Sequence, residues 1–121
     1  CGTRYFVPAA VLDDAVTEYI HCVNTEVMCR EDISAYSKAA WCCYHLIRIH
    51  PFSDGNGRVG RLVAMWALRR CGFNLLVQLS GPGHLRQQFI DAIRAADSAN
   101  GDVSTLSDFV WEQCEVAAAL V

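Results

Sequence analysis

Two long segments with apolar residues at helical spacing stand on either side of a short polar turn, and this arrangement most constrains the fold. The first segment covers residues 32–49 and the second covers residues 58–71. Apolar residues that recur every three or four positions predict helices with a buried face. Pro51 ends the first helix, because it has no N–H to donate and disfavours helical geometry at His50. The sequence therefore predicts two central helices that meet at this turn.

The turn has the composition of an anion-binding site. Residues 50–61 read His-Pro-Phe-Ser-Asp-Gly-Asn-Gly-Arg-Val-Gly-Arg. Gly55 and Gly57 flank Asn56, and such a sequence lets successive backbone N–H groups converge on an anion. The positive end of the next helix lies directly behind them. We therefore expect a phosphate group to bind at this position.

The charged residues of the turn favour a nucleotide over a bare anion. Arg58 and Arg61 are three positions apart, so both project from one face of the helix, where guanidinium groups grip phosphate oxygens. Cations oppose the dipole at a helix N-terminus, which favours an anionic ligand over a purely structural turn. Asp54 would repel bare phosphate but suits phosphate bound with Mg²⁺. An imidazole is the side chain most suited to general base catalysis near neutral pH, which makes His50 a candidate base.

These residues resemble the signature of the Fic family, His-Pro-Phe-x-Asp/Glu-Gly-Asn-Gly/Lys-Arg-x-x-Arg, and every specified position is filled. Members usually transfer AMP from ATP to a hydroxyl group of a target protein. The resemblance implies that His50 is the general base and that Asp54 holds Mg²⁺, for which Mn²⁺ can substitute. It implies that Phe52 turns inward and anchors the loop in the core. The phosphate-binding residues would be Gly55, Asn56, Gly57, Arg58 and Arg61.

The resemblance also gives expectations outside the turn. The segment 2–7 is similar to the end of a β-hairpin flap that orients the target, with Tyr5 and Phe6 as its packing or target-facing residues. The nucleotide base would lie near the 84–89 helix and the loop before it. Many members carry an inhibitory helix with Ser/Thr-x-x-x-Glu-Gly/Asn, but Ser104 and Asp108 match only its spacing. Such a restraint comes from a missing segment or a partner chain, or it does not exist.

The remaining sequence predicts an all-α fold, which in the Fic family is a helical bundle with two central helices. Helices are expected over residues 8–28, 84–98 and about 104–120, with an extended connector over 73–79. The first helix would bury Ile20, and the helix after the turn would carry Leu62, Trp66 and Leu68 on its apolar face. We interpret residues 1–121 as a single Fic domain. Because it begins at Cys1 rather than methionine, we expect a fragment of a longer protein.

Composition excludes several other classes of protein. The net charge is −3 and the basic residues are scattered, which argues against nucleic-acid binding. No apolar run approaches the ~18 residues of a membrane span. The seven cysteines are odd in number and form no Cys-x-x-Cys pair, so free thiols in a reducing, cytoplasmic compartment are expected.

The resemblance thus implies a protein adenylyltransferase that moves AMP from Mg-ATP to a Ser, Thr or Tyr hydroxyl, or removes it in the same site. The Gly-Asn-Gly turn favours adenylyl transfer, since the family's phosphorylating branch has a lysine-containing loop. Two alternatives stay open. One is a Fic enzyme that uses another phosphate-containing donor, and the other is a non-catalytic module that binds the target.

Overall fold

The computed structural model describes residues 8–121, so the expected flap residues Tyr5 and Phe6 lie outside the described part. Within residues 8–121 every regular element is helical, which confirms the all-α prediction. In chain order the elements are a 3-10 turn (Ala9–Val11), α1 (Leu12–Cys22), a π-helical turn (Val23–Val27), α2 (Ala35–Ile49), α3 (Asn56–Arg70), α4 (His84–Ser98) and α5 (Ser104–Ala119). The connector between α3 and α4 is extended without being a strand, as predicted.

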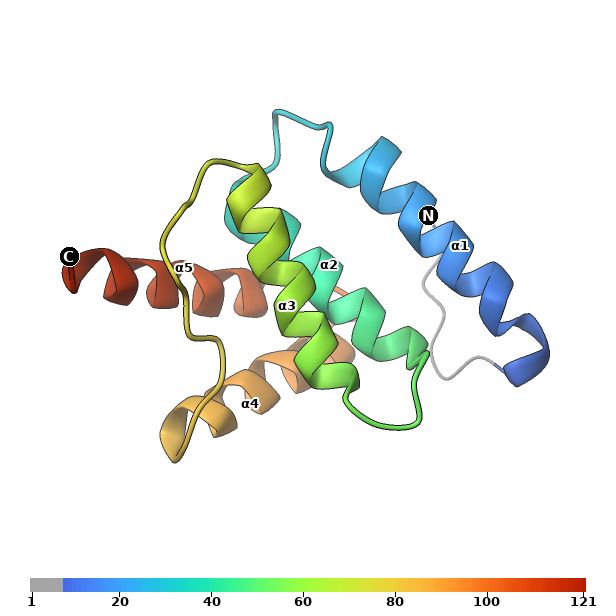
Figure 1. Ribbon diagram of the computed structural model, residues 1–121. Coiled ribbons are helices and arrows are strands. Elements are labelled where there is room, and N and C mark those ends of the chain that lie inside the picture. Colours follow the sequence, from blue (N-terminus) through green and yellow to red (C-terminus); the bar gives the residue numbers. More distant parts are fainter. Residues whose placement is uncertain (1–7) are drawn as a thin grey trace.

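Helix α2 is the centre of the bundle. It packs against α1, α3 and α5, while α4 packs against α5, and Figure 1 shows α2 and α3 between α1 on one side and α4 with α5 on the other. Two tyrosine hydroxyls tie it to its neighbours. Tyr19 of α1 donates to the carbonyl oxygen of Cys42 at 2.6 Å, and Tyr44 of α2 donates to Asp97 of α4 at 2.7 Å. The central position of α2 confirms its expected role.

Helix α3 packs on α2 through small side chains rather than through large ones. A Cβ atom at Gly60 would lie 2.9 Å from Cγ1 of Ile47, so only glycine permits the observed approach. The expected apolar face was partly wrong, because Leu62 is 62% exposed and Trp66 is 42% exposed. The buried side of α3 instead consists of Asn56, Gly60, Ala64, Ala67 and Leu68. Small residues let the two backbones approach closely, which fixes the ends of both helices relative to each other.

The helix ends follow local rules of the sequence. Ser34 caps α2, since its side chain accepts a hydrogen bond from the Ser37 amide at 3.1 Å. Gly72 adopts φ 97° after α3, and the Phe73 amide donates to the Leu68 carbonyl at 3.0 Å, as in a Schellman motif. In α1 the expected burial of Ile20 was wrong, because this side chain is 52% exposed. The predicted boundaries of α2, α3, α4 and α5 otherwise agree with the structure within three residues.

The cysteines are mostly free thiols, as expected. Burial raises the pKa of Cys42 and that of Cys43 to about 12, so both stay protonated in the core. Cys22 is disulfide-bonded, and for this residue the expectation of a free thiol was wrong. Over the described residues, the helices are too short or too polar for a membrane span.

Candidate functional site

His50 ends α2 in a left-handed conformation that is unusual for a residue other than glycine. Its φ and ψ are both 57°, and its amide donates to the Leu46 carbonyl at 3.1 Å. A non-glycine residue in this region costs on the order of 1–3 kcal/mol and persists only where its surroundings impose it. Here Pro51 prevents further helix, as the sequence predicted. The result is an exposed imidazole held at the end of a rigid helix.

The loop after His50 is held by the side chain of Asn56. This side chain is 5% exposed, and its Oδ1 accepts from the Phe52 amide at 3.0 Å while its Nδ2 donates to the Phe52 carbonyl at 2.8 Å. The phenyl ring of Phe52 is 48% exposed, so the expectation that it turns inward was wrong. The backbone of Phe52, rather than its ring, anchors the loop.

The N-terminus of α3 is left open for an anion. Gly55 precedes the helix with φ 82°, which a side chain would make unfavourable, and no side chain caps the helix or adds a carboxylate in its first turn. The first intrahelical hydrogen bond runs from the Val59 amide to the Gly55 carbonyl at 3.0 Å. The amides of residues 56–58 therefore have no carbonyl partner within the helix. They can donate together to one ligand at the positive end of α3.

The two arginines of the turn behave differently. Arg58 is exposed, and its Nη2 lies 3.7 Å from Oδ2 of the exposed Asp54, a distance at which a surface ion pair contributes little. Arg61 folds inward, with its Cζ 5.0 Å from the ring centroid of Phe89 on α4. Burial lowers the pKa of Arg61, and the charges of Arg58 and Arg86 lower it further. An anion placed between these cations would relieve their repulsion.

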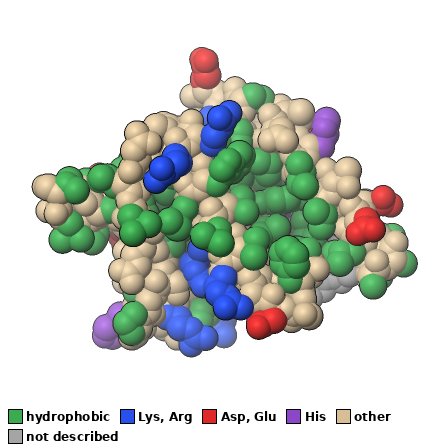
Figure 2. Space-filling model, in the orientation of Figure 1, with side chains coloured by type: hydrophobic (Ala, Val, Ile, Leu, Met, Phe, Trp, Pro, Cys, Tyr) green, Lys and Arg blue, Asp and Glu red, His purple; other side chains and the backbone are tan. Residues whose placement is uncertain are grey.

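A cavity of about 480 Å³ lies between the start of α3 and one face of α4. Its cationic end contains Arg58 and Arg61, and its apolar wall consists of Phe89, Ile90 and Ile93. Figure 2 shows Lys and Arg side chains gathered over the start of α3 and α4, with a second group over the end of α3. A cavity with one cationic end and one apolar wall suits a nucleotide, whose phosphates and base have matching properties.

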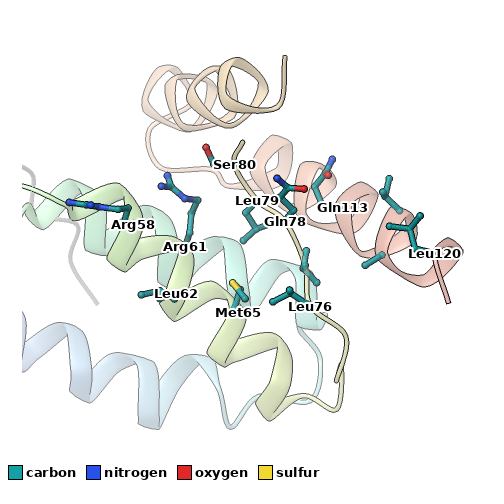
Figure 3. Close-up of a pocket in the computed structure, with 13 residues that line it drawn as sticks. Arg58, Arg61, Leu62, Met65, Leu76, Gln78, Leu79, Ser80, Gln113 and Leu120 are labelled. Carbon is teal, nitrogen blue, oxygen red and sulfur yellow. The ribbon is translucent and has the colours of Figure 1, made fainter. Parts of the chain in front are cut away.

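A second cavity of about 740 Å³ lies on the other side of the same arginines. It is formed by α3, the connector before α4, and the end of α5, and its lining is mainly apolar (Figure 3). Arg58, Arg61 and Ser80 line both cavities. Figure 3 shows Arg61 extending from α3 toward the connector segment that carries Ser80. The two arginines thus lie between the 480 Å³ cavity and the mainly apolar 740 Å³ cavity.

Asp54 is the carboxylate of the turn, and 93% of its side chain is exposed. The described residues contain no group of three or more His, Cys, Asp or Glu side chains suited to a metal ion. Mg²⁺ needs no such group, since it commonly binds through one or two carboxylates together with substrate phosphates and water. An accessible carboxylate beside the open N-terminus of α3 fits this mode of binding.

Three features of the site were missed by the sequence analysis. The two hydrogen bonds of the Asn56 side chain to the Phe52 backbone, which hold the loop, were not predicted. The close contact at Gly60 was signalled only by the four-residue spacing of Gly60, Ala64 and Leu68. The nucleotide base was expected near the 84–89 helix, but nothing in the spacing of the apolar residues of α4 showed that they line a cavity.

The sequence model described as the Fic/DOC family matches residues 4–68, which is more than half of the chain. A Fido domain-containing protein of Dictyostelium discoideum is 41% identical over 96 residues, 79% of this chain and 64% of that protein. Protein adenylyltransferase Fic of Aedes aegypti is 36% identical over 78 residues, 64% of this chain and 14% of that protein. The corresponding protein of Caenorhabditis elegans, protein adenylyltransferase fic-1, is 29% identical over 85 residues, 70% of this chain and 16% of that protein. This chain therefore spans less than two thirds of each relative.

Proposed function

Because this chain belongs to the Fic/DOC family, we propose that it transfers AMP from Mg-ATP to a Ser, Thr or Tyr hydroxyl of a target protein. Relatives named protein adenylyltransferase support this choice of reaction. The observation that carries the proposal is the junction of α2 and α3, where an exposed imidazole precedes an uncapped helix N-terminus bearing two arginines. A structural turn has no use for this combination.

His50 acts as the general base in this proposal. Its imidazole takes the proton of the target hydroxyl while the hydroxyl oxygen bonds to the α-phosphorus of ATP. The bond between the α-phosphorus and the bridging oxygen to the β-phosphate breaks, and pyrophosphate leaves. The left-handed backbone of His50 and the Asn56 side chain hold the base and the phosphate site in a fixed relation. Positioning of this kind supplies most of the catalysis in phosphoryl-type transfers.

The phosphates are bound by the open end of α3. The amides of Asn56 and Gly57 donate to them, and Gly55 provides the backbone turn that exposes these amides. Arg58 and Arg61 bind the outer phosphates and stabilise the charge of the departing pyrophosphate. The nucleotide base of ATP lies against the apolar wall of the cavity, which is formed by Phe89, Ile90 and Ile93.

Asp54 would hold Mg²⁺, or Mn²⁺ in its place. The ion would neutralise charge on the phosphates when bound. Asp54→Asn should reduce transfer while preserving the fold, because the side chain of Asp54 is 93% exposed and its ion pair with Arg58 is long, at 3.7 Å. Equal rates of transfer by the variant and the wild type over a range of Mg²⁺ concentrations, including limiting ones, would count against this role.

The direct test is incubation of the chain with Mg-ATP and a cell lysate, followed by intact-mass and peptide analysis for an added AMP. Comparison with other nucleoside triphosphates and with a phosphocholine donor separates adenylyl transfer from the use of another donor. Target association without any change in covalent mass would favour the non-catalytic binding module instead.

A further inference from the structure

Arg86 on α4 is one of the cations that line the 480 Å³ cavity in which we propose that the nucleotide binds. It lies in the first turn of α4, where no acidic residue is present and where a cation opposes the helix dipole. It faces the same cavity as Arg58 and Arg61, although it comes from a different element and from outside the signature of the turn. This placement opposes the helix dipole, and an anionic ligand in the cavity would offset that cost.

The carboxylates of the cleft do not neutralise Arg86. Asp97 is engaged at the far end of the cavity, where it accepts from Tyr44 at 2.7 Å and from Arg48 at 3.2 Å. Asp54 faces Arg58 at 3.7 Å. Among the described ion pairs, none includes Arg61 or Arg86. The start of α3 and the start of α4 therefore present a surplus of positive charge to one cavity.

The order of residues along α4 shows which part of a nucleotide would meet Arg86. Arg86, Ile90 and Ile93 lie on one helical face and line the cavity, with the cation at the N-terminal end. Arg94 lines the same cavity but lies eight residues further on, about 12 Å along the helix at 1.5 Å per residue. Arg61 lies over the ring of Phe89 at 5.0 Å, and Arg86 is three residues before Phe89 on the same helix, so Arg86 lies one helical turn from the ring that Arg61 contacts, at the phosphate end of the cavity.

We infer that Arg86 is a third phosphate-binding arginine, which makes the site selective for donors with a polyphosphate chain over nucleoside monophosphates. This inference rests on the proposed function, because it assigns the donor class for the same site. A guanidinium group contacting the phosphates beyond the α-phosphate would add charge-assisted hydrogen bonds to ATP and to ADP but none to AMP. The phosphate-binding arginines would then come from two helices, α3 and α4, rather than from α3 alone.

The test uses Arg86→Gln, with Arg70→Gln as the matched control. Arg70 is an exposed arginine in the last turn of α3 and lines neither cavity. Calorimetry is carried out with inorganic tripolyphosphate, Mg-ATP and AMP. The expected result is a loss of about tenfold in affinity for tripolyphosphate and Mg-ATP in Arg86→Gln, with AMP affinity changed less than twofold. The control should match the wild type for all three ligands.

Three results would overturn the inference. They are unchanged tripolyphosphate affinity in Arg86→Gln, an equal loss of AMP affinity, and a wild-type chain that binds no tripolyphosphate. A chain that binds tripolyphosphate through Arg86 yet adds no AMP to any protein would contradict the proposed function alone. A chain that transfers AMP, but whose Arg86→Gln variant keeps the wild-type affinity for tripolyphosphate, would contradict this inference alone. Circular dichroism of both variants checks that the helices are retained.

Discussion

Two connections between consecutive helices share a backbone device but differ in their electrostatics. Between α2 and α3, His50 adopts φ 57°, and between α4 and α5, Asn100 adopts φ 56°. In the second connection, the Gly101 amide donates to the Ala96 carbonyl at 2.8 Å, and the Asp102 carboxylate accepts from the Ser104 amide at 2.9 Å. Thus α5 begins beside a carboxylate, whereas α3 begins without a cap and with two arginines.

The difference separates a structural connection from a candidate site. Asp102 satisfies an amide at the start of α5 and complements the helix dipole, so that connection is complete without a ligand. At the start of α3, amides without a helical carbonyl partner stand beside two arginines, of which Arg58 lies 3.7 Å from Asp54, so an added anion could bind there. Left-handed geometry alone is therefore no sign of function. The two connections differ in their local partners, because a carboxylate accepts an amide at the start of α5, whereas no side chain caps the start of α3.

The largest expected effect comes from removing the imidazole of the first connection. His50→Ala should lower the rate of AMP transfer by about 100-fold or more, because a positioned general base contributes about that factor. Mg-ATP affinity should stay within twofold. Asn100→Ala is the matched control, since it alters a residue of the same backbone geometry and should leave the rate within twofold. Time courses by intact mass measure both variants, and transfer by His50→Ala at the wild-type rate would rule out the base.

The next effect comes from the side chain that holds the loop. Asn56→Ala removes two hydrogen bonds to the Phe52 backbone, and we expect a stability loss of about 1–3 kcal/mol together with slower transfer. Urea denaturation and transfer rates measure the two effects. If stability falls while transfer is unchanged, the loop geometry held by Asn56 does not matter for the reaction.

A substitution at the contact between α2 and α3 should mainly lower the free energy of unfolding. Gly60→Ala places a Cβ 2.9 Å from Cγ1 of Ile47 and 3.2 Å from the Cys43 carbonyl oxygen, so α2 and α3 must separate slightly. Overpacking of this kind costs about 1–3 kcal/mol. Gly72→Ala is a useful control, because it meets no atom within 4 Å and differs only in backbone strain. A Gly60→Ala variant as stable as the wild type would contradict the close-packing account, whatever loss backbone strain causes in Gly72→Ala.

The smallest effect concerns the second connection and its dependence on pH. Hydrogen bonds from Ser104 hold the pKa of Asp102 below its ordinary value. Such a carboxylate stabilises the fold above its unfolded pKa of about 3.9, and this contribution is lost as the pH falls through the lower folded-state pKa. Asp102→Ala should therefore lose less stability than the wild type between pH 5 and pH 2, measured by urea midpoints. An identical acid dependence would show that the cap contributes nothing, and Mg-ATP affinity at pH 7 should not change.

Helix boundaries were predictable because their causes are local. Ser34, Pro51 and Gly72 each start or stop a helix through their own backbone or side-chain chemistry. The packing face of α3 was less predictable, since large apolar residues were expected inside. The contact with α2 instead uses small residues, and Leu62 remains exposed.

The site was predictable in composition but not in detail. The order of residues in the turn indicated an anion site, because nearby glycines, arginines and a helix start act together over short distances. The burial of the Asn56 side chain and the exposure of the Phe52 ring depend on how the turn folds over the helices. The wall on α4 depends on contacts between segments far apart in the sequence. No local pattern encodes those contacts.

The glycine contact between α2 and α3 has a consequence for how heat should inactivate the protein. The backbones of α2 and α3 are in close contact at Gly60. We therefore expect that the junction between them cannot unfold locally while the surrounding helices stay folded. AMP transfer should then be lost at the same temperature as the whole bundle unfolds. There should be no range of temperature below the melting transition in which the chain is folded but no longer transfers AMP.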